Sequence, residues 1–273
     1  MNRTPYMGPD RRKNRSGLVF KIAMVVLIIG IILLISYSCG KKEEKLDYSN
    51  MQLVQKQLPK DDAPVAVFET SMGTFKAVLF PDKAPNYCKF FTKLVNDGYY
   101  DGTYVFAVSN GVYFMGGSKT NDGVSNDDTD TTQLDLEKSV DLLPIKGALC
   151  GYTQETGALM WKKKTATSYL LFVNNYDLTE EEQSELDDYI KQGKIVNESV
   201  ADIIDENGGV LNWIEQHSIF AQVYDGMDVY EKICGYDVKD EETLQPIEDI
   251  KFDKVYMSTY GENKNDSAFA AEK

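Results

Sequence analysis

Histidine and cysteine, the residues that most often serve as acid–base groups, nucleophiles and zinc ligands near neutral pH, are scarce in this sequence. The chain of 273 residues has one histidine, His217, and four cysteines. A zinc site with several histidine ligands is therefore excluded, and no two cysteines have the CxxC spacing of a structural zinc site. The cysteines are Cys39, Cys88, Cys150 and Cys234. We therefore expect no metal and no cofactor. His217 is the only histidine available for acid–base chemistry.

Three of the cysteines lie in apolar surroundings along the sequence. Cys88 and Cys150 fall on apolar faces of the elements predicted for them, and Cys234 lies near a helix end. Free thiols commonly pack in such places, so these three are predicted to be buried and unreactive. A disulfide between two of them is the alternative.

Charge is divided unevenly along the chain. The formal net charge is −14, yet residues 1–40 have a basic excess, so the remaining residues are more acidic than this total. So acidic a body repels a phosphate backbone, and nucleic acid is not expected as a partner. Two acidic runs, Glu180–Glu182 and Asp240–Glu242, lack the loop spacing of a calcium site and are interpreted as solvated surface.

Residues 18–39 have the composition of a membrane anchor. From Ile22 to Ser38 the chain carries no charge, and residues 1–17 before it hold a cluster of arginines and a lysine. An apolar run of this length can cross a bilayer, and the basic cluster favours a cytoplasmic N-terminus with the rest of the chain outside. The run ends at Cys39, so cleavage and lipidation of Cys39, as in bacterial lipoproteins, is the alternative. Both interpretations predict a cell-membrane protein with an extracytoplasmic domain.

The sequence after the anchor divides by composition. Residues 40–62 are polar and lack helical or strand periodicity, so they are interpreted as a tether. The folded body is assigned to residues 63–260, with a helical insertion at 178–209 and a long polar loop at 120–136. Residues 261–273 have no apolar pattern and are interpreted as a flexible tail.

Short apolar runs rich in β-branched and aromatic residues predict eight strands in the body. They are 65–70, 74–80, 104–108, 112–115, 148–152, 168–173, 218–223 and 250–257. Helical spacing predicts one helix from Pro85 to the residues before Gly98 and another from Met227 to Ile233. A mainly β fold with a closed or nearly closed barrel and two helices at its ends suits this order.

Several ordered motifs resemble the cyclophilin-type peptidyl-prolyl isomerases. They are FETSMGTFKAVLFPDKAPNYCKFF from Phe68, GYYDGT from Gly98, FMGG at Phe114–Gly117, KGALCGY from Lys146 and HSIFAQVYDGMDVYEKI from His217. The resemblance covers roughly residues 65–257 and implies a cyclophilin-like eight-stranded antiparallel barrel with two capping helices. It also implies catalysed rotation about X-Pro bonds, in which a hydrophobic pocket grips the proline ring while an arginine stabilises the twisted amide.

This chain departs from the family at the positions that the resemblance makes catalytic. The family's Phe-His-Arg-Ile-Ile corresponds to Val105–Ser109, which puts Ala107 where the catalytic arginine stands. The family's Phe-Met-x-Gln-Gly-Gly corresponds to Val112–Gly117, so Met115 replaces the glutamine that steadies that arginine. No catalytic residue is therefore assigned, and a lysine among residues 162–164 is the alternative donor.

The resemblance still implies an apolar pocket for a proline ring. Its residues would be Val112, Tyr113, Met115, Leu171, Trp213, Ile214 and His217. His217 would line this pocket rather than transfer protons, and Trp213 either lines it or seals the barrel. Tyr152 and Thr153 would line a neighbouring groove, which the Tyr152 ring would narrow.

These expectations support three hypotheses of function. The first is a prolyl isomerase with an atypical pocket, which assists the folding of exported proline-containing polypeptides with weak or absent turnover. The second is a peptide-binding or chaperone-like module without catalysis. The third is a structural partner in an envelope complex that uses the inserted helices at 178–209.

Overall fold

The computed structural model describes residues 46–124, 134–156, 163–176 and 198–269, together with a few positions between 178 and 188. The chain divides after Lys45 into two compact units, and all of the described residues belong to the second unit. The predicted segments 1–17 and 18–39, with Cys39, lie outside the described residues. Within the described ranges, no helix is both long and apolar enough to cross a membrane.

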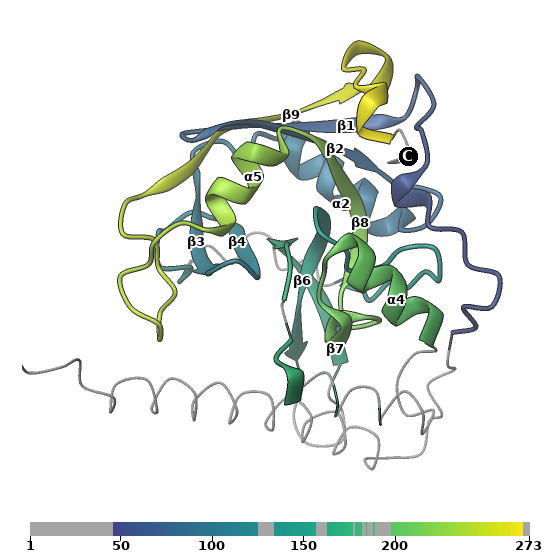
Figure 1. Ribbon diagram of the computed structural model, residues 1–273. Helices are drawn as coiled ribbons and strands as arrows, with labels where there is room; N and C mark the ends of the chain where they lie inside the picture. Colours follow the sequence, from purple (N-terminus) through teal and green to yellow (C-terminus); the bar gives the residue numbers. More distant parts are fainter. Residues whose placement is uncertain are drawn as a thin grey trace, which may run out of the picture. The chain divides into compact units, whose positions relative to one another are not determined.

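The described unit is built on one antiparallel sheet that closes on itself (Figure 1). Its strands are β1 (Pro64–Thr70), β2 (Gly73–Leu79), β3 (Thr103–Ser109), β4 (Tyr113–Ser118), β5 (Leu134–Asp135), β6 (Ala148–Thr156), β7 (Lys163–Val173), β8 (Ser218–Asp225) and β9 (Ile250–Thr259). The order is β4-β3-β9-β1-β2-β8-β6-β7, and pairing of β7 with β4 closes the ring. The predicted eight-stranded antiparallel barrel is confirmed.

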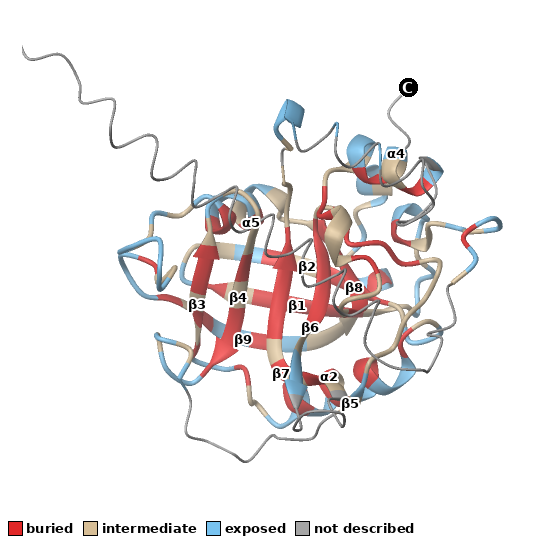
Figure 2. Cartoon of the chain, turned by 90° about the horizontal axis from the view of Figure 1, so that it is seen from below, coloured by how far each residue is buried: buried red, intermediate tan, exposed pale blue. Residues whose placement is uncertain are grey.

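Aromatic rings fill the interior of the barrel. Phe68 and Phe75 stack across the β1–β2 hairpin with ring centroids 4.8 Å apart, and Phe114 of β4 stacks on Phe172 of β7 at 4.2 Å. Alternate residues of each strand point into the barrel, but the outer face of some strands is covered as well, so β1 and β8 are buried at most positions. Figure 2 shows the buried residues concentrated along the strands.

The two predicted helices cap this core. Helix α2 (Pro85–Asn96) begins with a proline, which the first turn of a helix tolerates because its amide has no partner there. Its Phe91 packs on Phe220 of β8 at 4.9 Å, and Tyr230 of helix α5 (Met227–Cys234) packs on Phe75 at 5.8 Å. Both predicted helices are confirmed within a residue or two.

The FMGG motif has a steric reason in this core. A Cβ at Gly116 would lie 2.6 Å from the Phe252 ring, which is too close for any side chain. Gly117 has a φ of +94°, a conformation that residues with a side chain rarely adopt. The two glycines therefore let β4 lie close to the Phe252 ring of β9. Their role in this motif is in packing and not in catalysis.

The segment assigned to a polar tether packs against the body from Leu46 onward, so the tether assignment is wrong for residues 46–62. Gln55, in a short 3-10 helix η1 (Val54–Lys56), is 1% exposed. Its side-chain amide accepts from the Leu143 N–H at 2.7 Å and donates to the Leu143 carbonyl at 2.9 Å and to Gln222 at 2.8 Å. The composition of the segment did not predict this packing, because here a polar side chain is buried by bonding to the Leu143 main chain.

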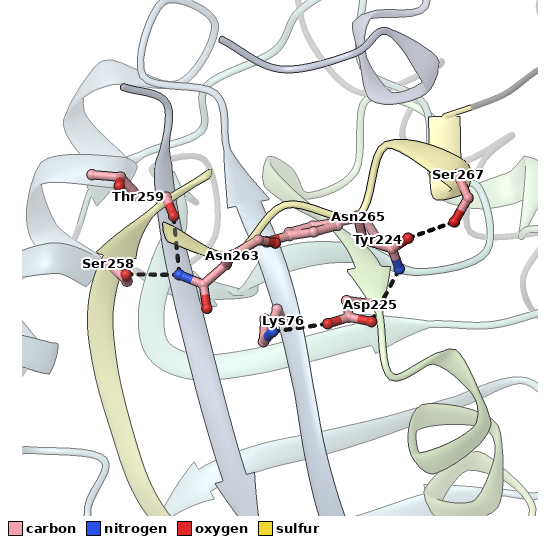
Figure 3. Close-up of polar contacts among 8 residues, drawn as sticks. All are labelled: Lys76, Tyr224, Asp225, Ser258, Thr259, Asn263, Asn265 and Ser267. Carbon is pink, nitrogen blue, oxygen red and sulfur yellow. Dashed lines mark hydrogen bonds and ion pairs between the residues drawn. The ribbon is translucent and has the colours of Figure 1, made fainter. Parts of the chain in front are cut away.

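The segment assigned to a flexible tail also packs, up to Phe269. Asn265 donates to the Asp225 carboxylate at 3.1 Å, and Asn263 donates to Ser258 at 2.7 Å (Figure 3). A short 3-10 helix η6 (Asp266–Phe269) brings Phe269 to 5.6 Å from the Tyr224 ring. A single aromatic residue gives no periodic pattern, which is why the sequence did not predict this contact.

The insertion and the polar loop are partly described. Helix α4 (Glu198–Asn207) lies where the second inserted helix is predicted, and Val200 and Ile204 face the body. Strand β5 lies within the segment predicted as a loop and adds two residues to the edge of β7. Residues 125–133 and most of 182–197 lie outside the described residues.

Candidate functional site

Three strands place Ala107 and Met115, the two predicted departures from the family, in one row. Ala107 of β3 lies directly opposite Met115 of β4, and Met115 lies opposite Leu171 of β7. Residues directly opposite in antiparallel strands project from the same face. The neighbouring Phe114 is part of the barrel core, so this row faces outward.

The row continues across the barrel wall. Leu171 pairs with Cys150 of β6, and Cys150 pairs with Ile219 of β8. These three side chains are at most 6% exposed and form one apolar cluster outside the barrel. Val112, Tyr113, Met115 and Trp213 are half-buried and pack against the same cluster. Five of the seven predicted pocket residues therefore meet on this face.

An aromatic group lies against this cluster. The Tyr113 and Trp213 rings meet edge to face at 5.3 Å, and Trp213 meets His217 edge to face at 5.6 Å. His217 in turn lies parallel to Tyr152, with centroids 6.3 Å apart. Edge-to-face and offset contacts of this kind are favourable because ring edges are positive and faces negative. The predicted groove residue Tyr152 therefore joins the pocket residues at this site.

Two predicted residues lie elsewhere or contribute little. Ile214 is 8% exposed and packs in a separate cluster with Leu143 and Val200. Trp213 beside it packs against the cluster of Leu171, Cys150 and Ile219, here called the pocket cluster. Thr153 is half-buried on β6, where it pairs with Ala166 and its hydroxyl donates to the Gly151 carbonyl at 3.4 Å. The apolar surface is thus formed without Ile214.

The surroundings of His217 keep its imidazole neutral at physiological pH. Burial is the main cause, with the nearby positive charge of Lys164 second, and together they lower the pKa of His217 to about 4. Its Nδ1 atom is buried and has no hydrogen-bond partner among the described residues. A neutral imidazole whose Nδ1 makes no hydrogen bond to the described residues is poorly oriented for proton transfer, which favours the pocket-lining interpretation.

One lysine of the alternative donors reaches this region. Lys164 Nζ donates to the Gln216 side chain at 2.7 Å, beside His217. Lys164 lies near the start of β7, where it pairs with Glu155. Leu171, which lies in one row with Ala107 and Met115, is seven positions further along the same strand. Lys162 and the side chain of Lys163 lie outside the described residues. In the described part of the chain, the lysine contact is therefore with the His217 end of the site.

The described cysteines lack the features of a nucleophile. Cys88, Cys150 and Cys234 are free and buried, so no disulfide joins any of these three. Burial raises the pKa of the Cys88 thiol to about 12 and raises the pKa values of the other two thiols as well. Because the thiolate is the reactive form, these thiols are inert at neutral pH. The described residues also contain no cluster of three potential metal ligands.

Sequence reasoning missed the polar residues that border this site. A small recess beside His217 is lined by Glu137, Lys138, Ser139, Leu142, Glu215, His217 and Ile219. Lys138 Nζ lies 3.4 Å from the Glu215 carboxylate there. No motif marked these residues, because ion pairs between segments about 80 residues apart leave no local pattern.

Comparison with known proteins identifies the family of this chain. The family model for cyclophilin type peptidyl-prolyl cis-trans isomerase/CLD matches residues 65–256. A protein of Staphylococcus aureus strain COL, provisionally named a peptidyl-prolyl cis-trans isomerase, is 26% identical over 208 residues, which are 76% of this chain and 98% of that protein. A protein of Staphylococcus haemolyticus with the same provisional name is 24% identical over 208 residues, covering 76% of this chain and 97% of its own.

Solved structures show the same fold. A Cryptosporidium parvum cyclophilin type peptidyl-prolyl cis-trans isomerase superposes with a TM-score of 0.53 at 18% identity, covering 72% of this chain and 98% of its own. The same enzyme crystallised in the presence of the dipeptide Ala-Pro gives a TM-score of 0.50 at 17% identity, covering 71% and 99%. With the family match over residues 65–256, this chain belongs to the cyclophilin-type peptidyl-prolyl cis-trans isomerase family.

Proposed function

We propose that this chain binds proline-containing segments of exported polypeptides and turns them over weakly or not at all. The observation that carries the proposal is the pairing of Ala107 with Met115 on the outward face of β3 and β4. The family's arginine and its supporting glutamine correspond to these two positions. Both the donor and its support are therefore replaced by apolar side chains at one place on the barrel.

The loss bears on catalysis more than on binding. Rotation about a peptide bond has a barrier of roughly 18 to 20 kcal/mol because amide resonance is lost on twisting. A preorganised donor that favours the twisted state contributes about a hundred- to a thousandfold in rate. Ala107 has no donor to offer, and Lys164 is hydrogen-bonded to Gln216 at the other end of the site.

The apolar surface that remains supports binding. Met115, Tyr113 and Trp213 are half-buried over a buried floor that includes Leu171. An apolar surface with few polar groups suits a proline ring. A structural relative was crystallised in the presence of Ala-Pro, which makes an X-Pro peptide the first ligand to test.

The proposed location follows from the sequence before Leu46. The uncharged run from Ile22 to Ser38 would anchor the chain in the cell membrane, as an uncleaved helix or through lipid on Cys39. The domain would then meet polypeptides after export, and an envelope protein is a further class of partner. Protease added to intact cells should degrade the domain, whereas protection until the cells are lysed would contradict this location.

Binding can be tested on the full chain in detergent micelles. Titration with a tetrapeptide that contains Ala-Pro, followed by calorimetry, should show saturable binding, and an Ala-Ala peptide of equal length should bind more weakly. Trp213→Ala should abolish binding because it removes the ring between Tyr113 and His217. Tyr256→Ala, which removes an exposed ring of β9, is the matched control and should bind normally. Equal binding by Trp213→Ala and the parent would refute the proposed pocket.

A further inference from the structure

The loop that carries Trp213 and His217 has an unusual backbone. It runs from the 3-10 helix η4 (Leu211–Trp213) to β8 and places only three residues between the two rings. Glu215 in this loop has a φ of 60°. A residue with a side chain seldom adopts this left-handed conformation unless its surroundings hold it there.

Contacts from two distant segments hold Glu215. The Tyr48 hydroxyl donates to Glu215 Oε1 at 3.1 Å, and Lys138 Nζ lies 3.4 Å from Oε2. Tyr48 is 8% exposed, and it belongs to the segment that leads from the predicted anchor into the barrel. Burial and the Glu215 carboxylate both raise the pKa of Tyr48, which therefore stays protonated and able to donate.

Packing fixes the same loop from both sides. Ile214 lies in a cluster with Tyr48, Leu143, Val200 and Ile204, which joins the N-terminal segment, the loop before β6 and helix α4. Trp213 packs instead in the pocket cluster. The adjacent side chains of Trp213 and Ile214 thus pack in different clusters. The next residue along the chain is Glu215, with its left-handed backbone conformation. A shift of this turn would move Trp213 and His217 together.

We propose that Tyr48 is a positioning residue: by hydrogen bonding to Glu215 it holds the left-handed turn that sets Trp213 against the pocket. Residues 46–62 then take part in the binding site, through this hydrogen bond and through Val54, which packs against the same apolar cluster as Trp213. Only the step from ring position to ligand affinity rests on the proposed function. The position of Trp213 can be measured without any ligand.

Trp213 fluorescence in the full chain provides that measurement. The chain has two tryptophans, so a Trp161→Phe background leaves Trp213 as the single emitter. Tyr48→Phe removes one hydroxyl and keeps the ring, and in detergent micelles it should shift the Trp213 emission to longer wavelength. Its Kd for the Ala-Pro tetrapeptide should rise about three- to tenfold, the range expected for one lost hydrogen bond.

A matched control separates positioning from general stability. Tyr260 is 1% exposed and its hydroxyl donates to the Asp266 carboxylate at 2.8 Å, in the C-terminal segment. Tyr260→Phe removes the same kind of bond and should leave the Trp213 emission and the Kd unchanged. A shift in Tyr260→Phe equal to that in Tyr48→Phe would overturn the inference.

Two substitutions at Glu215 test the turn itself. Glu215→Ala loses both contacts and keeps the conformational penalty, so the emission should shift at least as far as in Tyr48→Phe. Glu215→Gly loses the same contacts but adopts a φ of 60° without strain, so the shift should be smaller. An unshifted emission in both Tyr48→Phe and Glu215→Ala refutes the inference. A parent chain that ignores the peptide refutes the proposed function instead, while the emission comparison still tests the turn.

Discussion

Replacing Gln55 by alanine should destabilise the barrel strongly, although the residue lies in a segment with the composition of a linker. The substitution removes three hydrogen bonds, two to Leu143 and one to Gln222. The Leu143 carbonyl still accepts from the Ile145 N–H at 2.8 Å, but the Leu143 N–H loses its side-chain acceptor. Three net hydrogen bonds and one orphaned buried donor together predict a loss of about 3 to 7 kcal/mol.

Denaturant unfolding of the full chain in detergent, followed by circular dichroism, measures this loss. Gln57→Ala is the matched control because Gln57 is exposed and lies two residues away. The control should stay within about 0.5 kcal/mol of the parent, as surface substitutions usually do. A Gln55→Ala chain as stable as the control would show that residues 46–62 do not belong to the folded unit.

Three further predictions concern titration, thiol access and the C-terminal segment. The pKa of His217 lies near 4 in the folded chain, below the unfolded value near 6.5. The neutral imidazole therefore contributes its full stability above pH 6.5, and this contribution is lost as the pH falls toward 4. The difference in unfolding free energy between the parent and His217→Gln should shrink over that window, and a constant difference would contradict the prediction. In a Cys39→Ser background the remaining three thiols should react with a thiol reagent only after unfolding, since all three are buried; rapid labelling of the folded chain would show otherwise. Asn265→Ala removes the bonds to Asp225 and Ser267 and should lower the free energy of unfolding by about 0.5 to 1.5 kcal/mol, whereas an unchanged value would mean that the segment in Figure 3 is not held by them.

The barrel could be predicted because its signals are periodic and local. The β-branched and aromatic runs of β1 and β2, Pro85 at the start of α2 and the glycines at 116 and 117 each constrain the chain over a few residues. The position of Ala107 opposite Met115 also follows from these signals, once β3 and β4 are a hairpin in the right register.

The supporting contacts of the site could not be predicted in this way. Gln55 and Tyr48 are each 167 residues from a side-chain partner, and single long-range hydrogen bonds produce no periodicity. The polar composition of residues 46–62 also predicts a tether. Burial of Gln55 depends on distant partners, which the local sequence does not show. Ile214 illustrates the same limit, since its turn away from Trp213 depends on the backbone conformation at Glu215.

The most direct test of binding without efficient turnover is the rate of cis–trans exchange in an Ala-Pro tetrapeptide, measured by NMR exchange spectroscopy with the full chain. The parent should bind the peptide and add little or no exchange, whereas Ala107→Arg with Met115→Gln, which restores the donor and its support, should exchange it about a hundredfold faster. Ala107→Met with Met115→Gln, which adds bulk without a donor, should stay as slow as the parent. A parent that already matches the arginine variant, and that loses its exchange in Lys164→Met, would contradict the account and identify Lys164 as the replacement donor.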